Sequence, residues 1–128
     1  MRLPVTFEQL QPILGTRDSE AAIRFYTEQL GFTLSFRDGL VPTNYIGLHR
    51  GSTQVHMQFQ HEYEMCPTRL RFRVDDPDAL YAEYQSRGVV TQMPPTDMSW
   101  GTREFALYDP DRNALMFYRY LKGTEERA

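Results

Sequence analysis

The feature of this sequence that most constrains its fold is an internal repeat at a spacing of 58 residues. When the chain is shifted onto itself by that distance, identical residues coincide: Asp18 with Asp76, Ala21 with Ala79, and Tyr26 with Tyr84. A repeated unit of this kind forms one small module whose apolar face is completed by its neighbour. The sequence therefore predicts two modules, over about residues 8–60 and 68–121, within a single domain that spans residues 1–128.

Apolar periodicity predicts the same order of elements in both halves. The first half is predicted to contain a strand, a helix and three further strands: 10–16, 19–30, 32–36, 45–49 and 54–60. The second half is predicted to contain a strand over 70–74, a helix from Pro77 to the residue before Gly88, the apolar pair Val89 and Val90, a proline-rich loop through Pro94 and Pro95, and strands over 103–108 and 114–120. Either Asp18 or Ser19 is a suitable N-cap for the first helix, and Asp76 is a suitable N-cap for the second.

The predicted order is βαβββ in each module, which indicates an α+β fold. We expect each module to form a curved, mixed sheet of four strands with its one helix on the convex side. The concave side then has no helix to cover it. Polar and aromatic side chains on that side need a ligand, water or the other module, so the sequence predicts a concave binding cup.

Composition excludes several classes of protein. Apolar residues make up 41% of the chain and aromatic residues 13%, which argues against intrinsic disorder. The net charge of −3 gives no general attraction to nucleic acid. No apolar run approaches the roughly 20 residues of a membrane span, and the first residues lack the apolar core of a secretion signal. The single cysteine, Cys66, agrees with a reducing compartment, so we expect a soluble, cytoplasmic protein.

The sequence contains no motif that indicates catalysis. There is no GxSxG elbow, no phosphate-binding glycine loop and no dinucleotide fingerprint. Asp75 and Asp76 resemble a carboxylate pair, but neighbouring residues of a strand-to-helix turn point in different directions, and helix capping explains Asp76. Cys66 has no base at motif spacing. We therefore expect the protein to bind a ligand rather than to turn it over.

Three stretches resemble the vicinal oxygen chelate superfamily, which includes glyoxalase I, extradiol dioxygenases, fosfomycin-resistance enzymes and bleomycin resistance proteins. They are RDSEAAIRFYTEQLGF at 17–32, VDDPDALYAEYQSRG at 74–88 and WGTREFALYDPDRNALMFY at 100–118. The resemblance extends over about residues 9–120, and the last stretch is most similar to bleomycin resistance proteins. It implies paired βαβββ modules and a homodimer.

The resemblance also identifies the positions at which metal-dependent members hold their ion. Here these positions carry Gln11, Arg69 and Met116, with His56 or Gln58 as a further inward-facing residue. An amide, a guanidinium and a thioether are poor donors for Zn²⁺, Fe²⁺, Ni²⁺ or Mn²⁺. We therefore predict no metal and no cofactor. A metal-dependent glyoxalase, lyase or dioxygenase that uses His56 as an unusual ligand is the alternative.

In bleomycin resistance proteins, aromatic side chains hold a flat heteroaromatic part of the drug. The resemblance implies this role for Phe36, Tyr45 and Trp100, whose rings stack on a planar ligand. From the residues alone, Phe36 and Tyr45 also suit structural positions in strands, whereas Trp100 lies in a loop without core periodicity. Further contacts to the ligand are expected from Gln11, His56, Gln58, Arg69, Arg103 and Met116.

These features favour a metal-free protein of the bleomycin-resistance type, which sequesters an aromatic drug or metabolite in clefts of a homodimer and so confers antibiotic resistance. A regulatory or partner-binding module is a second alternative. Arg69 and Arg103 disfavour a strongly cationic drug such as bleomycin. Acidic residues near the expected rim offset them: Asp38, Glu62, Glu64 and Asp97. The sequence is equally compatible with an anionic or neutral aromatic metabolite.

Overall fold

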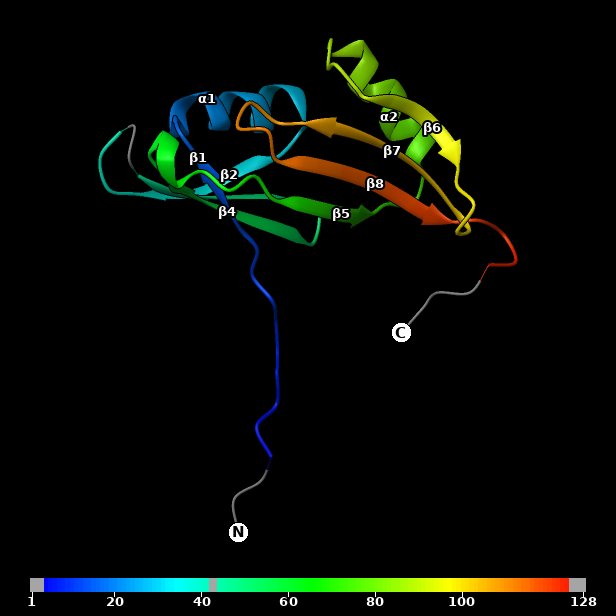
Figure 1. Ribbon diagram of the computed structural model, residues 1–128, viewed down its shortest axis with the longest axis horizontal. Coiled ribbons are helices and arrows are strands. Elements are labelled where there is room, and N and C mark those ends of the chain that lie inside the picture. The colour runs from blue at the N-terminus through cyan, green and yellow to red at the C-terminus, as the bar shows by residue number, and fades with distance from the viewer. Residues whose placement is uncertain (1–3, 42–43, 125–128) are drawn as a thin grey trace.

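The structure of the protein is a computed structural model, which describes residues 4–41 and 44–124. Two four-stranded sheets lie side by side, and both helices cover the same side of this layer (Figure 1). The strand order is β1-β4-β3-β2 in the first sheet and β5-β8-β7-β6 in the second. The fold is therefore α+β with two βαβββ modules, as the repeat predicts.

The two modules contain equivalent elements in the same order. Module one consists of β1 (Ile13–Thr16), α1 (Ser19–Arg24), the π-helical turn η1 (Phe25–Gln29), β2 (Thr33–Asp38), β3 (Tyr45–Arg50) and β4 (Thr53–Phe59). Module two consists of β5 (Arg69–Arg73), α2 (Pro77–Ser86), β6 (Met93–Asp97), β7 (Thr102–Tyr108) and β8 (Ala114–Tyr120). The 3-10 turn η2 (Glu62–Glu64) lies between them. None of these helices is long and apolar enough to cross a membrane, within residues 4–41 and 44–124.

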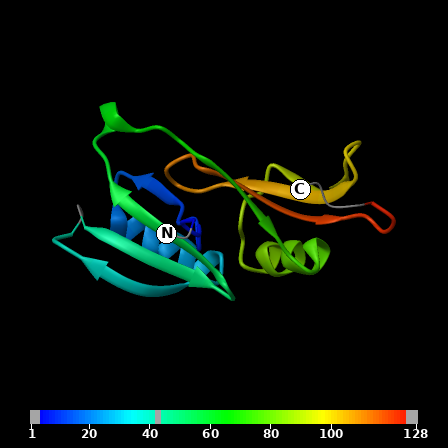
Figure 2. The ribbon, with the colours of Figure 1, turned by 90° about the horizontal axis from the view of Figure 1, so that it is seen from below.

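The first and last strands of each module pair in parallel, whereas the other neighbouring strands pair antiparallel. Ile13 of β1 is opposite His56 of β4, and Arg71 of β5 is opposite Met116 of β8. The strands β2 and β6 form the outer edges of the layer, and β5 lies on the side of its sheet that is next to module one (Figure 2).

Both helices begin at the predicted capping aspartates. The Asp18 carboxylate accepts the backbone N–H groups of Glu20 and Ala21 at 3.0 and 3.2 Å. The Asp76 carboxylate accepts that of Ala79 at 3.0 Å, and a proline follows it at the first helical position. These bonds satisfy donors that have no partner within the helix itself.

The first helix is less regular than its predicted span of 19–30. Only Ser19–Arg24 is α-helical, and the following turn is wider, with the Leu30 N–H donating to the Phe25 carbonyl at 3.1 Å. Gly31 then adopts a φ of +77°, the left-handed conformation that commonly ends a helix. The predicted end of the helical segment is thus confirmed, but its last turn is π-helical.

The prediction of a loop through Pro94 and Pro95 is wrong, because Met93–Asp97 is strand β6. This strand lies at the outer edge of its sheet, where a residue without an N–H group is tolerated. Its pairing with β7 is irregular between Met93 and Thr96, the interval that contains both prolines. Edge position, which local sequence does not reveal, therefore accounts for the difference.

One apolar core lies between the sheets and the helices and extends through both modules. Its buried side chains include Leu14, Tyr26, Leu30, Ile46, Leu48, Met57, Tyr84, Phe105, Leu107 and Leu115. Phe32 of module one contacts Phe72 of module two edge to face, with ring centroids 6.1 Å apart. The modules thus share a core on the helix-covered side and leave the opposite side of both sheets uncovered.

A buried polar network joins the modules at the turn between β7 and β8. The Asp109 carboxylate accepts the Tyr26 hydroxyl at 2.7 Å and the Asn113 side-chain amide at 2.9 Å. The same amide donates to the Gly15 carbonyl of module one at 3.2 Å. Burial raises the pKa of Tyr26 well above its ordinary value, and the nearby Asp109 charge acts in the same direction. The hydroxyl therefore stays protonated and serves as a donor.

Two arginines of module one also reach module two. The Arg17 backbone N–H donates to the Asp111 carboxylate at 2.9 Å, and its side-chain Nε lies 3.3 Å from the same oxygen. Arg50 donates two hydrogen bonds to Glu83 of α2, at 2.8 and 2.9 Å. These contacts lie at two separate points of the boundary between the modules, so they fix the relative orientation of the two sheets.

Replacement of Tyr26 by phenylalanine is expected to destabilise the protein, because the buried Asp109 carboxylate loses a donor while the ring keeps its place. A hydrogen bond to a charged group contributes on the order of 2 kcal/mol to the free energy of unfolding. Urea denaturation of Tyr26→Phe should show a loss of about that size. Tyr63→Phe is the matched control, since the Tyr63 side chain is 86% exposed. Equal stability of the two variants would contradict the role of the network.

Candidate functional site

The sheet face that carries no helix, named the uncovered face, forms the candidate site (Figure 2). Successive side chains of a strand point to opposite sides, so the residues between core positions lie on this face. The predicted site residues on its strands are Phe36, Tyr45, His56, Gln58, Arg69 and Met116. The uncovered face therefore brings together most of the residues that the sequence singles out.

Three rings of module one, named the aromatic cluster, gather on the uncovered face: Phe36, Tyr45 and His56. The rings of Phe36 and Tyr45 are inclined by only 15°, with centroids 6.1 Å apart. His56 meets both of them edge to face, at 5.1 and 5.3 Å. All three side chains are half-buried, so part of each ring is open to a ligand.

Gly47 of β3 makes room for Phe36. A Cβ atom at this position would lie 2.2 Å from Cε2 of the Phe36 ring, far inside van der Waals contact. The ring therefore lies directly over the backbone of β3, an approach that only glycine permits. The position of Phe36, and with it the geometry of the aromatic cluster, depends on Gly47.

Both ring nitrogens of His56 are engaged within module one. Nδ1 lies 2.8 Å from the Tyr45 hydroxyl, and Nε2 lies 2.8 Å from the side-chain nitrogen of Gln54. With the Gln54 amide in this orientation, Nε2 accepts a hydrogen bond and Nδ1 donates one. Gln58, two residues further along β4, is exposed on the same face. His56 is thus a positioning group whose two ring nitrogens both have hydrogen-bond partners within module one.

The residues at the predicted metal positions do not fit a metal ion. The Gln11 side-chain amide donates to the carbonyls of Pro12 and Gln54, at 3.0 and 3.2 Å. Arg69 is exposed on β5, and Met116 is half-buried on β8. In the part of the chain that the structure describes, no three His, Cys, Asp or Glu side chains are grouped to hold a metal. The donor set is therefore one of amide, guanidinium and thioether groups.

Module two places a buried carboxylate on the uncovered face. Glu104 of β7 is 5% exposed and accepts the Thr102 hydroxyl at 2.6 Å and the Arg71 guanidinium at 2.8 Å. Burial opposes its ionisation, but hydrogen bonds from Thr102 and Arg71 outweigh this and hold the pKa of Glu104 below its ordinary value. The Arg71 guanidinium also lies over the Tyr118 ring, 4.0 Å from its centroid. The position of the Arg71 side chain is thus fixed by the Glu104 carboxylate and by the Tyr118 ring.

Trp100 lies in the turn between β6 and β7, next to this carboxylate. Its indole Nε1 is 3.4 Å from Oε2 of Glu104, a long hydrogen bond. The side chain is 52% exposed, so about half of its surface is available for contact. The structure therefore places Trp100 beside the uncovered face, and its role in ligand binding stays a prediction.

Three arginines, named the arginine row, follow one another on the uncovered face of β5: Arg69, Arg71 and Arg73. All three are exposed. Arg73 lies over the Tyr120 ring, 5.5 Å from its centroid. Arg69 has no side-chain hydrogen bond or ion pair to any residue in the described ranges. On the described strands of module one, no arginine or lysine lies on the uncovered face, so the row is particular to module two.

The prediction that Arg103 lines the cup is wrong in its placement. Its guanidinium is bound by Asp78 of α2 at 2.8 and 2.9 Å and by Asp97 of β6 at 2.9 Å, on the helix-covered side of β7. A step of one residue along a strand moves a side chain to the other face, so the inward position belongs to Glu104. Arg103 instead fastens the helix to the sheet.

Within one chain, the three predicted aromatic contacts are not brought together. Phe36 belongs to the outer strand β2 of the first sheet, and Tyr45 belongs to its neighbour β3. Trp100 follows β6, the outer strand of the second sheet, and these elements lie at opposite ends of the layer (Figure 1). A ligand that contacts all three rings therefore needs more than one copy of the uncovered face.

A hollow of about 440 Å³ lies where the two modules meet. Gln9 and Leu10 of the N-terminal arm (residues 4–12) line it, together with Gln54 of β4 and Arg71 of β5. The hollow thus lies between the hydrogen-bond partner of His56 and the arginine row.

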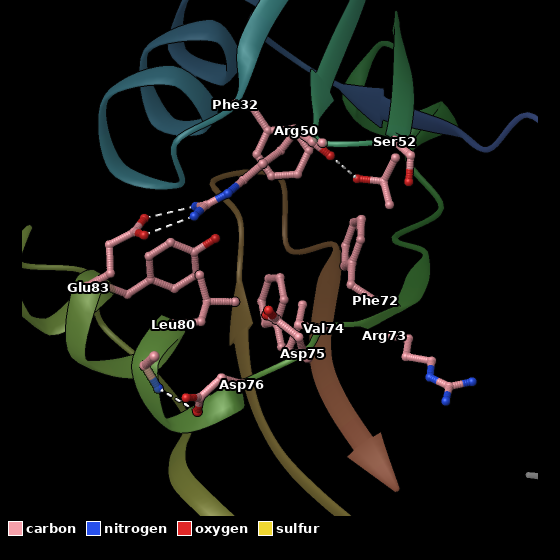
Figure 3. Close-up of a pocket in the computed structure, with 15 residues that line it drawn as sticks. Phe32, Arg50, Ser52, Phe72, Arg73, Val74, Asp75, Asp76, Leu80 and Glu83 are labelled. Carbon is pink, nitrogen blue, oxygen red and sulfur yellow. Dashed lines mark hydrogen bonds and ion pairs between the residues drawn. The ribbon is translucent and has the colours of Figure 1, made fainter.

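A larger cavity of about 630 Å³ lies between the modules and is bordered by α2 (Figure 3). Apolar side chains of both modules line it: Phe32, Phe72, Val74, Leu80 and Phe117. The Arg50 and Glu83 pair closes one side. The adjacent turn between β3 and β4 spans only residues 51–52, whereas its repeat equivalent spans residues 109–113. None of the predicted site residues lines this cavity.

Sequence reasoning missed Arg71, Glu104 and Tyr118, although a signal for them exists. Along β5, Leu70 and Phe72 point into the core, so Arg71 between them points to the uncovered face. The same alternation directs Glu104 of β7 and Tyr118 of β8 to that face. The resemblance led only to the first residue of β5. The alternation along the whole of each strand identifies Arg71, Glu104 and Tyr118 as residues of the uncovered face.

The chain matches the sequence profile of the glyoxalase/bleomycin resistance protein/dioxygenase superfamily over residues 8–117. It is 28% identical over 129 residues to the bleomycin resistance protein of Geobacillus stearothermophilus, a match that covers 88% of this chain and 96% of that protein. The bleomycin resistance protein of Staphylococcus aureus matches to the same extent.

Solved structures of similar proteins have the same fold. The bleomycin-binding protein of Streptomyces verticillus, in complex with copper(II)-bleomycin, matches with a TM-score of 0.74 at 31% identity, over 89% of this chain and 97% of that one. A bleomycin resistance determinant encoded on the transposon Tn5 matches with a TM-score of 0.75 at 26% identity, over 89% of this chain and 98% of that one.

Glu104→Gln is expected to lower the free energy of unfolding at neutral pH, and to lower it by a smaller amount at acidic pH. Because the pKa of Glu104 is depressed in the folded protein, its carboxylate stabilises the fold above the ordinary pKa, and this contribution is lost as the pH falls through the depressed value. The free energy of unfolding should drop by about 1 kcal/mol near neutral pH, and by less near pH 3. Glu28→Gln, at an exposed position, is the control. A loss that is the same at both pH values would count against this role.

Proposed function

Because the chain belongs to the glyoxalase/bleomycin resistance protein/dioxygenase superfamily, we propose that it is a metal-free binding protein of the bleomycin-resistance type. It captures an aromatic small molecule without turnover, so that protection against a drug follows from sequestration. The open aromatic cluster, on a sheet face that no helix covers, carries this proposal. The Streptomyces verticillus protein, which binds copper(II)-bleomycin on the same fold, supports it.

The chemistry of the face supports binding rather than metal-assisted catalysis. Gln11, Arg69 and Met116 offer an amide, a guanidinium and a thioether where a metal site needs imidazole or carboxylate donors. Both nitrogens of His56 are already hydrogen-bonded. Such groups orient an organic ligand through hydrogen bonds and contact, which is the usual pattern of a small-molecule site with apolar walls and few polar groups.

Stacking supplies the affinity in this proposal. A planar ligand beside the nearly parallel rings of Phe36 and Tyr45 extends an arrangement that already exists in the protein. Each aromatic contact contributes about 0.5–1.5 kcal/mol beyond the burial of area, so three contacts together amount to roughly 10- to 1,000-fold in affinity. Gly47 and the hydrogen-bonded His56 hold these rings before the ligand arrives, which lowers the entropy cost of binding.

A second copy of the chain completes the cleft. The N-terminal arm extends away from the body on the uncovered side (Figure 1). Its side chains Val5, Phe7 and Leu10 are 69%, 97% and 90% exposed. Apolar side chains that stand so far from their own core indicate a surface that another protein covers. We assign this surface to a twofold-related copy.

Twofold symmetry would also unite the aromatic residues. We propose that module one of one chain faces module two of the other, and the twofold symmetry of an isologous dimer then repeats this contact. Trp100 of the partner subunit then lies opposite Phe36 and Tyr45. This arrangement yields two equal clefts per dimer and explains how residues at opposite ends of one chain serve a single ligand.

Gly47→Ala is expected to weaken ligand binding, because the added methyl group displaces the Phe36 ring without removing any aromatic residue. We expect the affinity for copper-loaded bleomycin, measured by calorimetry, to fall about 2- to 10-fold. Fluorescence of Trp100, the only tryptophan, provides a second readout. In a Phe36→Ala background the glycine substitution should have no further effect, which is the control for its mechanism. Unchanged affinity of Gly47→Ala would refute the role of the cluster, and no binding by the parent would remove bleomycin as a ligand.

Light scattering after size exclusion is expected to give twice the 15.1 kDa mass of one chain. The combined substitution of Phe7 and Leu10 by serine should shift the protein toward the monomer, because it removes the apolar contacts of the arm. Gln9→Ser, between them, is the control and should leave the dimer intact. A parent protein that runs as a monomer at all concentrations would overturn the proposed cleft.

A further inference from the structure

The arginine row lies near the middle of the uncovered face. Its strand, β5, separates the rest of module two from module one (Figure 2). The hollow of about 440 Å³ beside it is lined by Arg71 from one module and by Gln54 from the other. Gln54 is bonded to His56 of the aromatic cluster at 2.8 Å. A molecule in this hollow therefore contacts the Arg71 guanidinium on one side. On its other side lies Gln54, and the aromatic cluster follows next to Gln54.

The row gives this part of the face a charge opposite to that of the whole chain. On β5, β7 and β8, the uncovered face carries the three arginines and a single carboxylate, Glu104. Glu104 compensates Arg71, which leaves Arg69 without a counter-charge among the described residues, whereas the chain has a net charge of −3. A concave surface with a local excess of one sign concentrates ligands of the opposite sign.

The internal repeat indicates that the architecture does not require these charges. With the shift of 58 residues, the arginine row corresponds to Gln11, Ile13 and Gly15 of module one. The strand β1 forms the same parallel pairing with β4 that β5 forms with β8, and it does so without a charged residue on this face. The arginines are thus a property of the surface of module two and not of the βαβββ fold.

Arg69 and Arg71 have donors to offer. Arg69 makes no polar side-chain contact with the described part of the chain. Arg71 uses one N–H for Glu104 and keeps its other N–H groups without an acceptor in that part. The planar fork of a guanidinium matches a carboxylate, phosphate or sulfonate group. Because Glu104 and Tyr118 hold Arg71 in place, its fork is oriented before any ligand binds.

Protection of a sheet edge does not account for the row. Charged side chains on an edge strand often prevent pairing with another chain, and β5 is an edge strand of its sheet. Arg71, however, is drawn across the face toward β7 by Glu104 and lies over the Tyr118 ring. It is thus directed over the floor of the cup instead of past the edge.

We propose that the ligand of the uncovered face is a planar aromatic acid, with its carboxylate, phosphate or sulfonate group bound by Arg69 and Arg71 and its ring stacked on the aromatic side chains. This ligand class rests on the proposed function and narrows it from aromatic molecules in general to anionic ones. Because Glu104 is already paired with Arg71, Arg69 favours an anionic group over a cationic group on a ligand of the same ring system.

Two fluorescent probes with one ring skeleton test the charge alone: 1-anilinonaphthalene-8-sulfonate and its uncharged analogue N-phenyl-1-naphthylamine. Both have the same aromatic surface to stack, but only the first carries an anionic group. We expect the parent protein to bind the sulfonate about tenfold more tightly than the neutral probe. Added salt should reduce this preference, because the arginines are exposed.

The variant Arg69→Gln should bring the ratio of the two affinities close to one by weakening the binding of the sulfonate only. Arg119→Gln is the matched control, since Arg119 is an exposed arginine on the other face of strand β8. It removes the same charge from the chain and should leave the ratio unchanged. Displacement of the sulfonate probe by benzoate, phenyl phosphate or benzenesulfonate, but not by benzyl alcohol, would support an anionic group on the natural ligand.

The outcomes separate this inference from the proposed function. Equal affinity of the parent for both probes would overturn the anionic ligand class and leave aromatic capture intact. An equal loss of both probes in Arg69→Gln would also overturn it, because Arg69 would then shape the cleft rather than bind a charge. If the parent binds none of the three compounds, that is, neither of the two probes nor bleomycin, both the ligand class and the proposed function are overturned.

Discussion

The buried carboxylate of Asp109 joins the two modules, and the contacts of Arg17 and Arg50 fix their orientation together with it. It accepts the hydroxyl of Tyr26 from module one and the amide of Asn113, which in turn donates to the Gly15 carbonyl. Apolar contacts such as that between Phe32 and Phe72 hold the modules together but have little directional preference. The hydrogen bonds supply the direction, and as a result both helices cover one side and both uncovered sheets open on the other.

What the sequence predicts well is what local pattern determines. The repeat, the order of elements and the capping roles of Asp18 and Asp76 follow from periodicity and short-range hydrogen bonding, and the structure confirms them. Strand β6 was not predicted because tolerance of its prolines depends on an edge position set by distant strands. Arg103 was assigned to the wrong face because a shift of one residue separates it from Glu104, and only strand register distinguishes the two.

The two halves of the uncovered face differ although their scaffolds are alike. Module one offers rings, which Gly47 and the hydrogen bonds of His56 hold in place. Module two offers charge, in which Arg71 and Glu104 compensate each other and Arg69 has no ion pair among the described residues. A duplicated scaffold thus gives a site with two chemically distinct walls, and a molecule with a flat ring and one charged end matches both.

The bond between Tyr26 and Asp109 also bears on how the chain folds as it is synthesised. These residues are 83 positions apart, so the tyrosine is synthesised roughly 4 to 17 seconds before its acceptor. During that interval, burial of the Tyr26 hydroxyl would leave it without a hydrogen-bond acceptor, which costs free energy. Contact of the hydroxyl with water is therefore favoured until Asp109 is available. The Tyr26 hydroxyl therefore gains its buried acceptor only when the turn between β7 and β8 has been made, in the final third of translation.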